Sequence, residues 1–120
     1  MMSLALAEEF ARDRVEAWNA HDFPRLLAHY VDDFEMNSPF IARFANELSG
    51  KLKGKARVAA YWQSALEQKP DLKFELLDVL AGASSVVVFY RTNLWRKVAE
   101  VFFFNDRDLV ERAAAHYQSD

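Results

Sequence analysis

Hydrophobic positions recur at helical spacing in two long segments of the chain. In residues 3–20, Leu6, Phe10 and Trp18 share one face, and Ser3 can cap the first turn. In residues 55–68, an apolar stripe repeats with the same period, which again predicts a helix with one buried face. The stripe consists of Val58, Tyr61, Trp62, Ala65 and Leu66.

Shorter elements are predicted between these two helices. Asp22 can cap a second helix that runs to about Tyr30, with Pro24 in its first turn. A short strand follows over residues 34–38 and is ended by the next proline. The segment 40–54 is apolar for a loop, which indicates that it lies over the core or includes a helical turn.

The second half of the chain changes to the two-residue period of β-strands. Strands are predicted over residues 72–80, 85–92, 97–105 and 109–117, with short turns between them. Three helices followed by an antiparallel meander indicate an α+β fold. The length of 120 residues fits a single domain over residues 1–120.

The strand over residues 97–105 is apolar on both faces. Alternation places Glu100 on a face that is otherwise made by Val98, Phe102 and Phe104. Because the opposite face is apolar too, it needs a cover of its own, and we expect a homodimer that forms through this outer face. Candidate interface residues are Val87, Phe89, Val101 and Phe103.

Glu100 is a carboxylate on an aromatic face, where a charge is costly unless it is paired or neutralised. Three roles are open: an ion pair with Arg14 or Arg91, an anchor for a polar ligand group, and a catalytic acid whose neutral form the rings favour. Arg14 interrupts the apolar stripe of the first helix. We favour an arginine that reaches solvent at the edge of the stripe over a buried guanidinium that faces Glu100.

The neighbour of Glu100 across the preceding turn depends on the strand register. A loop centred on Trp95 places Tyr90 opposite Glu100, whereas a loop centred between Leu94 and Trp95 places Phe89 there. The first arrangement predicts a polar group beside the carboxylate.

Composition excludes several classes of function. The net charge of −3 comes without a basic block, which argues against nucleic-acid binding. The chain has no cysteine, which excludes thiol chemistry and fits a cytoplasmic location. Its first residues predict neither a signal peptide nor a membrane span. His21 and His29 lack metal-type spacing, and neither a metal nor a cofactor is predicted.

Eight short motifs follow one another along the chain. They are residues 17–22 (AWNAHD), 30–33 (YVDD), 38–40 (SPF), 53–54 (KG), 60–62 (AYW), 80–82 (LAG), 99–104 (AEVFFF) and 115–117 (AHY). Their order resembles the SnoaL-like branch of the nuclear transport factor 2-like superfamily, from about Glu8 to Tyr117. The resemblance implies a cystatin-like cone, in which a curved antiparallel sheet wraps around three N-terminal helices and a deep apolar pocket, usually as a homodimer.

The resemblance also allows the ketosteroid isomerase mechanism to be compared position by position. The general base of that family corresponds to Ser38, its oxyanion tyrosine corresponds to Arg14, and a second tyrosine that supports the first corresponds to Trp62. The protonated acid corresponds to Glu100, where a carboxylate is retained. Because serine is no base at neutral pH without activation, steroid isomerisation by that mechanism is not expected.

The residues also match two further reactions of the superfamily only in part. Epoxide hydrolysis of the limonene type uses an arginine between two aspartates. Arg14 and Glu100 could form half of this group, and Asp78 is the only acidic candidate well inside another long strand for the second carboxylate. In polyketide cyclisation, a carboxylate on a pocket strand acts as acid/base, a part that Glu100 could take. His116 is the alternative by residue type, but alternation places it on the outer face.

We therefore expect a small-molecule-binding protein with an apolar pocket that contains one carboxylate, Glu100, and a ligand that is apolar or partly polar. One alternative is a cofactor-independent isomerase, cyclase or hydrolase with Glu100 as its catalytic acid/base. Another is a dimeric protein-interaction module without catalysis. Besides Glu100, the predicted pocket consists of Arg14, Trp18, Met36, Ser38, Phe40, Trp62, Tyr90, Phe102, Ala113 and Tyr117.

Overall fold

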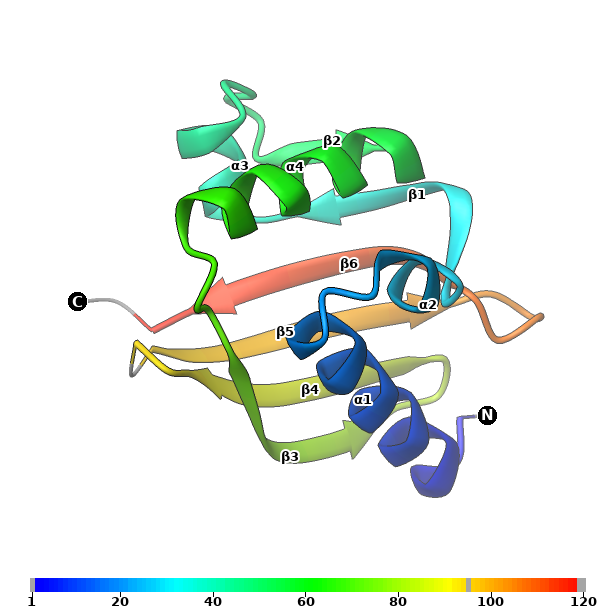
Figure 1. Cartoon of the computed structure of the whole chain (residues 1–120). Helices are drawn as coiled ribbons and strands as arrows, with labels where there is room; N and C mark the ends of the chain where they lie inside the picture. Colours follow the sequence, from blue (N-terminus) through cyan, green and yellow to red (C-terminus); the bar gives the residue numbers. More distant parts are fainter. Residues whose placement is uncertain (1, 95, 119–120) are drawn as a thin grey trace.

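Helices cover one face of a curved sheet in the computed structural model, which describes residues 2–94 and 96–118 (Figure 1). Within these residues the sheet has six strands. The helices are α1 (Leu4–Asn19), α2 (Phe23–Leu27), α3 (Pro39–Phe44) and α4 (Lys55–Gln68). The strands are β1 (Tyr30–Asn37), β2 (Lys51–Lys53), β3 (Phe74–Ala81), β4 (Ser85–Thr92), β5 (Lys97–Phe104) and β6 (Val110–Tyr117). The predicted α+β class is confirmed.

Helices α1 and α4 have the predicted bounds to within a residue. The Ser3 hydroxyl accepts a hydrogen bond of 3.1 Å from the backbone N–H of Leu6, which satisfies a free donor in the first turn. Helix α4 begins after Gly54, whose φ of +105° suits a residue without a Cβ atom. The most deeply buried residues of the α4 stripe are Val58, Trp62 and Leu66.

Helix α2 is shorter than predicted. The sequence predicts a helix to about Tyr30, but α2 ends at Leu27, and Tyr30 begins strand β1. Tyr30 pairs with Val110 of β6 and is 2% exposed. Burial in the sheet outweighs the weak helical preference of so short a segment. Asp22 caps the helix as predicted, because its side chain accepts a hydrogen bond from the backbone N–H of Arg25.

The segment predicted as a loop over residues 40–54 contains helix α3 and strand β2. Ser38 was predicted to end a strand, but it caps α3 and accepts a hydrogen bond of 3.2 Å from the N–H of Phe40. Strand β2 pairs antiparallel with β1 and places Leu52 opposite Met36. Three residues are too few to show a strand period, so the sequence pattern gives no sign of β2.

The strands lie in the order β2-β1-β6-β5-β4-β3. Strands β3 to β6 form the predicted antiparallel meander. Strand β1 pairs in parallel with β6, however, whereas the prediction has an antiparallel sheet throughout. The connection from β1 to β6 contains most of the chain, which is ample for the crossover that parallel neighbours need. Register shifts near Asp78 and Phe104 are irregularities of the kind that bend a sheet.

Strand β5 has one fully buried face and one partly covered face. Glu100 is 1% exposed and shares the helix-facing side with Val98, Phe102 and Phe104, which confirms the predicted alternation. The opposite, outer face of the sheet carries no helix (Figure 1). On it, the side chains of Ala99, Val101 and Phe103 are half-buried in the single chain.

The β4–β5 hairpin has a register that differs from both predicted alternatives. Glu100 lies opposite Val88, and Tyr90 lies opposite Val98, so the loop is centred on Leu94. The hydroxyl of Thr92 accepts hydrogen bonds of 3.2 and 3.3 Å from the backbone N–H groups of Leu94 and Arg96, which favours this tight loop. Trp95, on which the prediction depended, lies outside the described residues.

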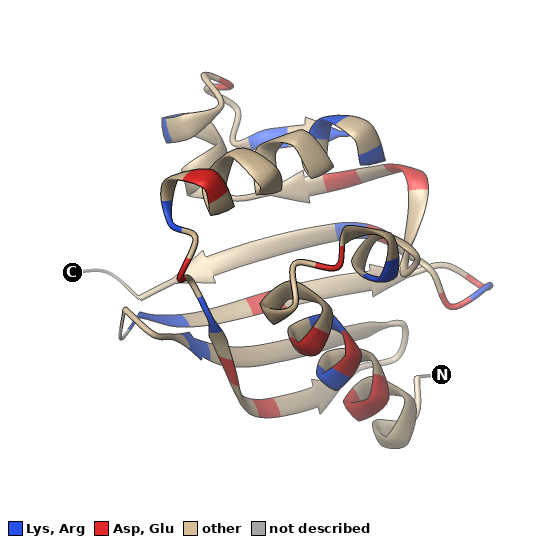
Figure 2. Cartoon of the chain, in the orientation of Figure 1, with Lys and Arg blue, Asp and Glu red and all other residues tan. Residues whose placement is uncertain are grey.

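Charges of both signs are interspersed over the helices and turns (Figure 2). This distribution fits the net charge of −3 and the sequence without a basic block. No helix in the part of the chain that the structure describes is long and apolar enough to cross a membrane.

Candidate functional site

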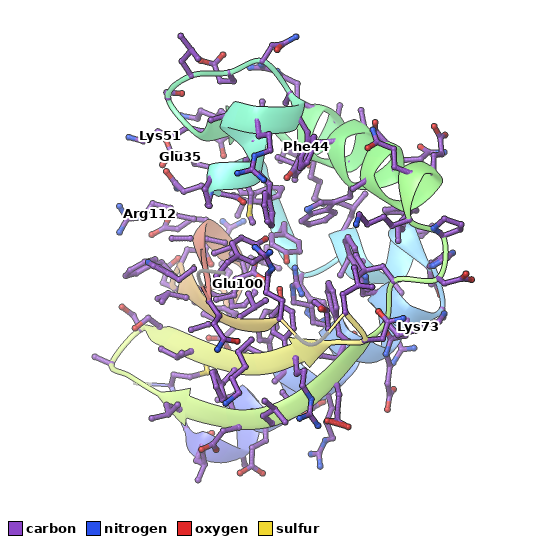
Figure 3. All side chains as sticks on the ribbon, turned by 90° about the vertical axis from the view of Figure 1, so that its left-hand side faces the viewer. Glu35, Phe44, Lys51, Lys73, Glu100 and Arg112 are labelled. Atoms are coloured by element: carbon purple, nitrogen blue, oxygen red, sulfur yellow. The ribbon has the colours of Figure 1, made fainter. Side chains whose placement is uncertain are left out.

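A buried carboxylate lies at the centre of the molecule. Glu100 lies between the sheet and the helices, whereas Glu35, Lys51 and Arg112 extend from the outer face (Figure 3). The hydroxyl of Tyr90 donates a hydrogen bond of 3.0 Å to Oε1 of Glu100. Tyr90 of β4 and Glu100 of β5 therefore meet inside the fold, on adjacent strands.

The second oxygen of this carboxylate contacts Arg14 of helix α1. Nη2 of Arg14 lies 3.4 Å from Oε2 of Glu100, and Nε donates a hydrogen bond of 2.9 Å to the hydroxyl of Tyr30. Arg14 is only 2% exposed, so the favoured interpretation of an arginine that reaches solvent is wrong. Its guanidinium carbon lies 4.9 Å from the ring centroid of Phe102 and 5.9 Å from that of Trp62. The rings and the carboxylate together compensate the buried cation.

The guanidinium of Arg14 stays charged despite its burial. Loss of solvent lowers the pKa of Arg14, but the opposite charge of Glu100 and the hydrogen bond to Tyr30 raise it, and the net direction is upward. The pair is therefore a cation and an adjacent carboxylate in an aromatic interior, which is the arrangement that the ion-pair hypothesis predicts.

All four tyrosines of the chain lie within electrostatic reach of Glu100. Burial and repulsion from Glu100 raise the pKa of Tyr30 to about 12, against the attraction of Arg14. Burial likewise raises the pKa values of Tyr61, Tyr90 and Tyr117, and Glu100 adds to each. The phenols therefore remain neutral hydrogen-bond donors at physiological pH.

Several of the predicted pocket residues contact one another, and most of them are buried. Trp18 and Trp62 meet edge to face with centroids 5.9 Å apart, and the rings of Phe40 and Tyr117 lie 4.4 Å apart. Eight of these residues are buried: Arg14, Trp18, Met36, Ser38, Trp62, Tyr90, Phe102 and Ala113. Phe40 and Tyr117 are half-buried, which places them at the periphery of the cluster.

Two depressions open at the surface, and Glu100 lines neither of them. The larger has a volume of about 350 Å³ and is lined by the ends of β1 and β6, helix α3 and the following loop. Ser38 is the predicted pocket residue in its lining. The smaller has a volume of about 240 Å³ and lies beside the paired ends of β3 and β4. Aromatic side chains, by contrast, pack directly around the Arg14–Glu100 pair.

The other candidate acid/base groups lie away from the centre. Asp78 is exposed and accepts a hydrogen bond from the N–H of Val79. Arg91, the alternative partner of Glu100, forms an ion pair with Glu75. His116 is exposed, as its predicted outward position requires, and its Nδ1 lies 3.2 Å from the carbonyl oxygen of Ala99. These positions leave Glu100 as the acid/base candidate of the interior.

Sequence reasoning missed two features of this site. Tyr30 and Tyr61 belong to the hydroxyl groups around Glu100 but were not assigned to the pocket. Tyr61 lies on the predicted stripe of α4 beside Trp62, which was an available signal. The second feature is a set of two buried N–H groups without a hydrogen-bond partner, Nη1 of Arg14 and Nε1 of Trp18. Only coordinates can show an unpaired donor.

The arrangement can orient a polar group or move a proton. A carboxylate that accepts hydrogen bonds from a phenol and a guanidinium is held in one orientation, and a ligand atom beside it would experience a fixed field. In residues 2–94 and 96–118, no three His, Asp or Glu side chains gather as metal ligands would.

The fold and part of the sequence are shared with known proteins. The family model of the SnoaL-like domain matches residues 11–118, and no curated protein matches the chain. A SnoaL-like protein of unknown function from Burkholderia thailandensis is 47% identical, with 98% of each chain covered and a TM-score of 0.93. An NTF2-like protein from Anabaena variabilis is 19% identical over 100% of this chain and 96% of that chain, with a TM-score of 0.78.

A protein with a cystatin-like fold from Methylobium petroleophilum is 20% identical over 99% of this chain and 80% of that chain, with a TM-score of 0.78. At this identity, the likeness to the last two structures shows the fold alone, and it confirms the predicted cystatin-like and nuclear transport factor 2-like architecture. The match of the family model over most of the length confirms the resemblance stated from the motifs. The chain therefore belongs to the SnoaL-like domain family.

Proposed function

We propose that this protein binds a small, mostly apolar molecule in the interior between helices and sheet, with Glu100 as the polar anchor. The observation that carries the proposal is the complete burial of Glu100 between Tyr90 and Arg14. Packing alone does not require these groups, because apolar residues in place of a buried ion pair are often as stabilising or more so. A retained polar centre in an aromatic interior is typical of ligand sites.

The half-buried aromatic residues at one end of the interior support an entrance there. Phe40 and Tyr117 contact each other, and the pKa of Tyr61 is raised by burial while its interaction with Ser38 lowers it. These three side chains are less covered than the residues around Arg14, so they can move at lower cost. A ligand that displaces them reaches Glu100 from the side of strand ends β1 and β6.

A thermal-shift screen with a diverse set of small hydrophobic molecules tests the proposal. We expect at least one chemical class to raise the unfolding temperature of the protein in a concentration-dependent way. The variant Glu100→Gln keeps an acceptor and should still fold, but its response to partly polar molecules should weaken. If no molecule of the set raises the unfolding temperature of the wild-type protein or of Glu100→Gln, this would count against ligand binding.

Catalysis is the second candidate function, and the contact of Tyr90 with Glu100 favours it. A buried phenol with a raised pKa stays protonated and can donate to Oε1 of Glu100 while the carboxylate accepts a proton from a bound molecule. The reaction would be a cofactor-independent isomerisation, cyclisation or hydrolysis. Glu100→Gln should abolish turnover and leave the circular dichroism spectrum unchanged. Activity that survives this change would exclude the assignment.

The outer face of the sheet supports a homodimer as part of the proposal. Val101 and Phe103 are half-buried on a face without a helix, and the guanidinium of Arg112 lies 4.2 Å from the ring centroid of Phe103. Light scattering should give the mass of a dimer, and Val101→Glu should give a monomer. A monomeric wild-type protein would instead leave this face for a different protein partner, as an interaction module requires. A cytoplasmic location stays a prediction of the sequence.

A further inference from the structure

Two arginines from different parts of the chain lie against the ring of Phe40, at the periphery of the aromatic cluster. The guanidinium carbon of Arg43, in α3, lies 5.5 Å from the centroid of this ring, and that of Arg96, just before β5, lies 5.6 Å from it. The two cations are therefore no farther apart than the sum of these distances. Because like charges repel each other, an anion that binds between the two guanidiniums is stabilised by both.

The charge of Arg43 is not balanced by a neighbouring carboxylate. Arg43 is exposed, and none of the ion pairs among the residues that the structure describes involves it. Its guanidinium carbon also lies 5.9 Å from the ring centroid of Phe44, a side chain that is 58% exposed. Contact with two rings restricts the position of the guanidinium, while its planar set of N–H donors can still bind an anion. Arg43 is thus a preorganised donor beside an exposed apolar surface.

The ring of Phe40 also connects this surface with the interior. The ring centroids of Phe40 and Tyr117 lie 4.4 Å apart. Burial raises the pKa of Tyr117, and repulsion from Glu100 adds to it, so Tyr117 lies within electrostatic reach of the buried carboxylate. Helix α3, the β4–β5 turn and the end of β6 lie on one side of the molecule (Figure 1), which faces the viewer in Figure 3. The two arginines therefore lie at the proposed entrance.

We infer that the ligand carries a carboxylate, which binds between Arg43 and Arg96 while its apolar body extends past Phe40 toward the interior. This inference rests on the proposed ligand binding and specifies the charge and the orientation of the molecule. A carboxylate can accept two hydrogen bonds from one guanidinium in a common plane. Because the ring of Phe40 lies beside both arginines, it can contact the apolar atoms next to the carboxylate.

The buried charges determine which end of the ligand stays outside. Glu100 is 1% exposed, and Arg14 already balances its charge. A second carboxylate in the interior would lose its hydration and lack a counter-ion, which is strongly unfavourable. At the entrance the same carboxylate keeps part of its hydration and gains two cations. The apolar end is therefore the one that enters.

Three probes with the same phenylalkyl body distinguish the possible charges: 4-phenylbutyrate as the anion, 4-phenylbutyramide as the neutral analogue and 4-phenylbutylamine as the cation. At low ionic strength, titration followed by tryptophan fluorescence should give 4-phenylbutyrate an affinity at least about tenfold above that of the amide, and the amine the weakest binding. Added salt should reduce the preference for 4-phenylbutyrate, because salt screens charges at the surface.

Exchange of each arginine for glutamine tests the two cations. Arg43→Gln and Arg96→Gln should each reduce the preference for 4-phenylbutyrate over the amide several-fold. The matched control is Arg107→Gln, which removes the same charge from the exposed β5–β6 turn at the other end of β5 and should keep the preference. In NMR spectra of the wild-type protein, 4-phenylbutyrate should shift the side-chain N–H resonances of Arg43 and Arg96 and leave that of Arg107 unchanged.

The remaining outcomes separate this inference from the proposed function. If the acid and the amide bind equally well, or if the preference survives in both Arg43→Gln and Arg96→Gln, the protein binds ligands but the carboxylate site is wrong. An equal loss of the preference in Arg107→Gln would likewise contradict the site, because it would indicate an effect of net charge alone. If none of the three probes binds while the wider hydrophobic screen yields ligands, the carboxylate is wrong and ligand binding stands. If that screen also fails, ligand binding itself is wrong.

Discussion

The hydroxyl of Tyr90 donates a hydrogen bond of 3.0 Å to Oε1 of Glu100 along a diagonal of the β4–β5 hairpin. Glu100 lies opposite Val88, so Tyr90 is two residues farther along the same face, within the reach of a long side chain. Because Arg14 contacts the other carboxylate oxygen, each oxygen of Glu100 has its own donor. The contributions of the two donors can therefore be measured separately.

Removal of the Tyr90 hydroxyl should destabilise the fold. Tyr90→Phe leaves Oε1 of Glu100 without its donor in a buried position, which should lower the free energy of unfolding by about 1–3 kcal/mol. Urea unfolding followed by circular dichroism measures the change. The control is Tyr61→Phe on the less buried side of the cluster, where the hydroxyl interacts with Ser38 and a smaller loss is expected. Equal losses in the two variants would mean that the buried hydrogen bond to Glu100 adds no more stability than the half-buried contact of Tyr61.

Arg14 and Glu100 should show strong coupling in a double-mutant cycle. Either single change to leucine leaves the other charge buried without its partner, and should cost about 3–5 kcal/mol. The double variant contains no buried charge, so its loss should be far smaller than the sum of the two single losses. Urea unfolding of all four proteins provides the coupling energy. Additive losses would show that the 3.4 Å contact makes no energetic difference to either group.

Alternation in the sequence predicted the face of Glu100, and its two partners, Arg14 and Tyr90, were among the predicted candidates, but the register that joins Tyr90 to Glu100 was not predicted. Strand period depends on neighbouring residues, so residues 97–105 sufficed to place Glu100 inside the fold. The register of the hairpin depends on loop geometry, and the hydrogen bonds of Thr92 to Leu94 and Arg96 cannot be read from residue types. The residue opposite Glu100 is Val88, two residues before the predicted Tyr90. Because side chains alternate with a period of two, Tyr90 nevertheless lies on the predicted face.

The burial of Arg14 could not be predicted from its own helix. In isolation, an arginine in an apolar stripe gains most by extending to solvent. The observed position depends on Glu100, which is 86 residues away, and on the ring of Phe102. The parallel pairing of β1 with β6 has a similar cause, since the residues of β1, the first strand in chain order, do not indicate the direction of a strand that follows most of the chain later.

Asp13 should make stability sensitive to acid. Burial raises the pKa of Asp13, but the hydrogen bonds with His29 and Arg25 together lower it by more. The folded-state pKa of Asp13 therefore lies below the usual 3.8. A lowered folded-state pKa contributes stability above the unfolded value, and this contribution is lost as the pH falls through the folded value. Asp13→Asn should therefore cost at most about 1 kcal/mol at neutral pH, and the difference from wild type should disappear in strong acid.

Unfolding curves over a series of pH values measure the Asp13 effect. The matched control is Asp32→Asn, because the Asp32 side chain is fully exposed and lies 3.8 Å from Lys55. Its stability should stay close to that of wild type at each pH. A difference between wild type and Asp13→Asn that persists unchanged in strong acid would show that packing, and not the charge of Asp13, causes the loss.

The four tyrosines should ionise at higher pH than free tyrosine. Burial and repulsion from Glu100 raise their pKa values above the usual 10.0, with Tyr30 at about 12. A raised folded-state pKa gives stability that is complete below pH 10 and is lost as the pH rises through the folded value, because the unfolded chain ionises first. Tyrosinate absorbance should therefore rise near pH 10 in denaturant, but in the native protein only together with unfolding seen by circular dichroism. Ionisation near pH 10 in a protein that remains folded would contradict the buried arrangement of the phenols around Glu100.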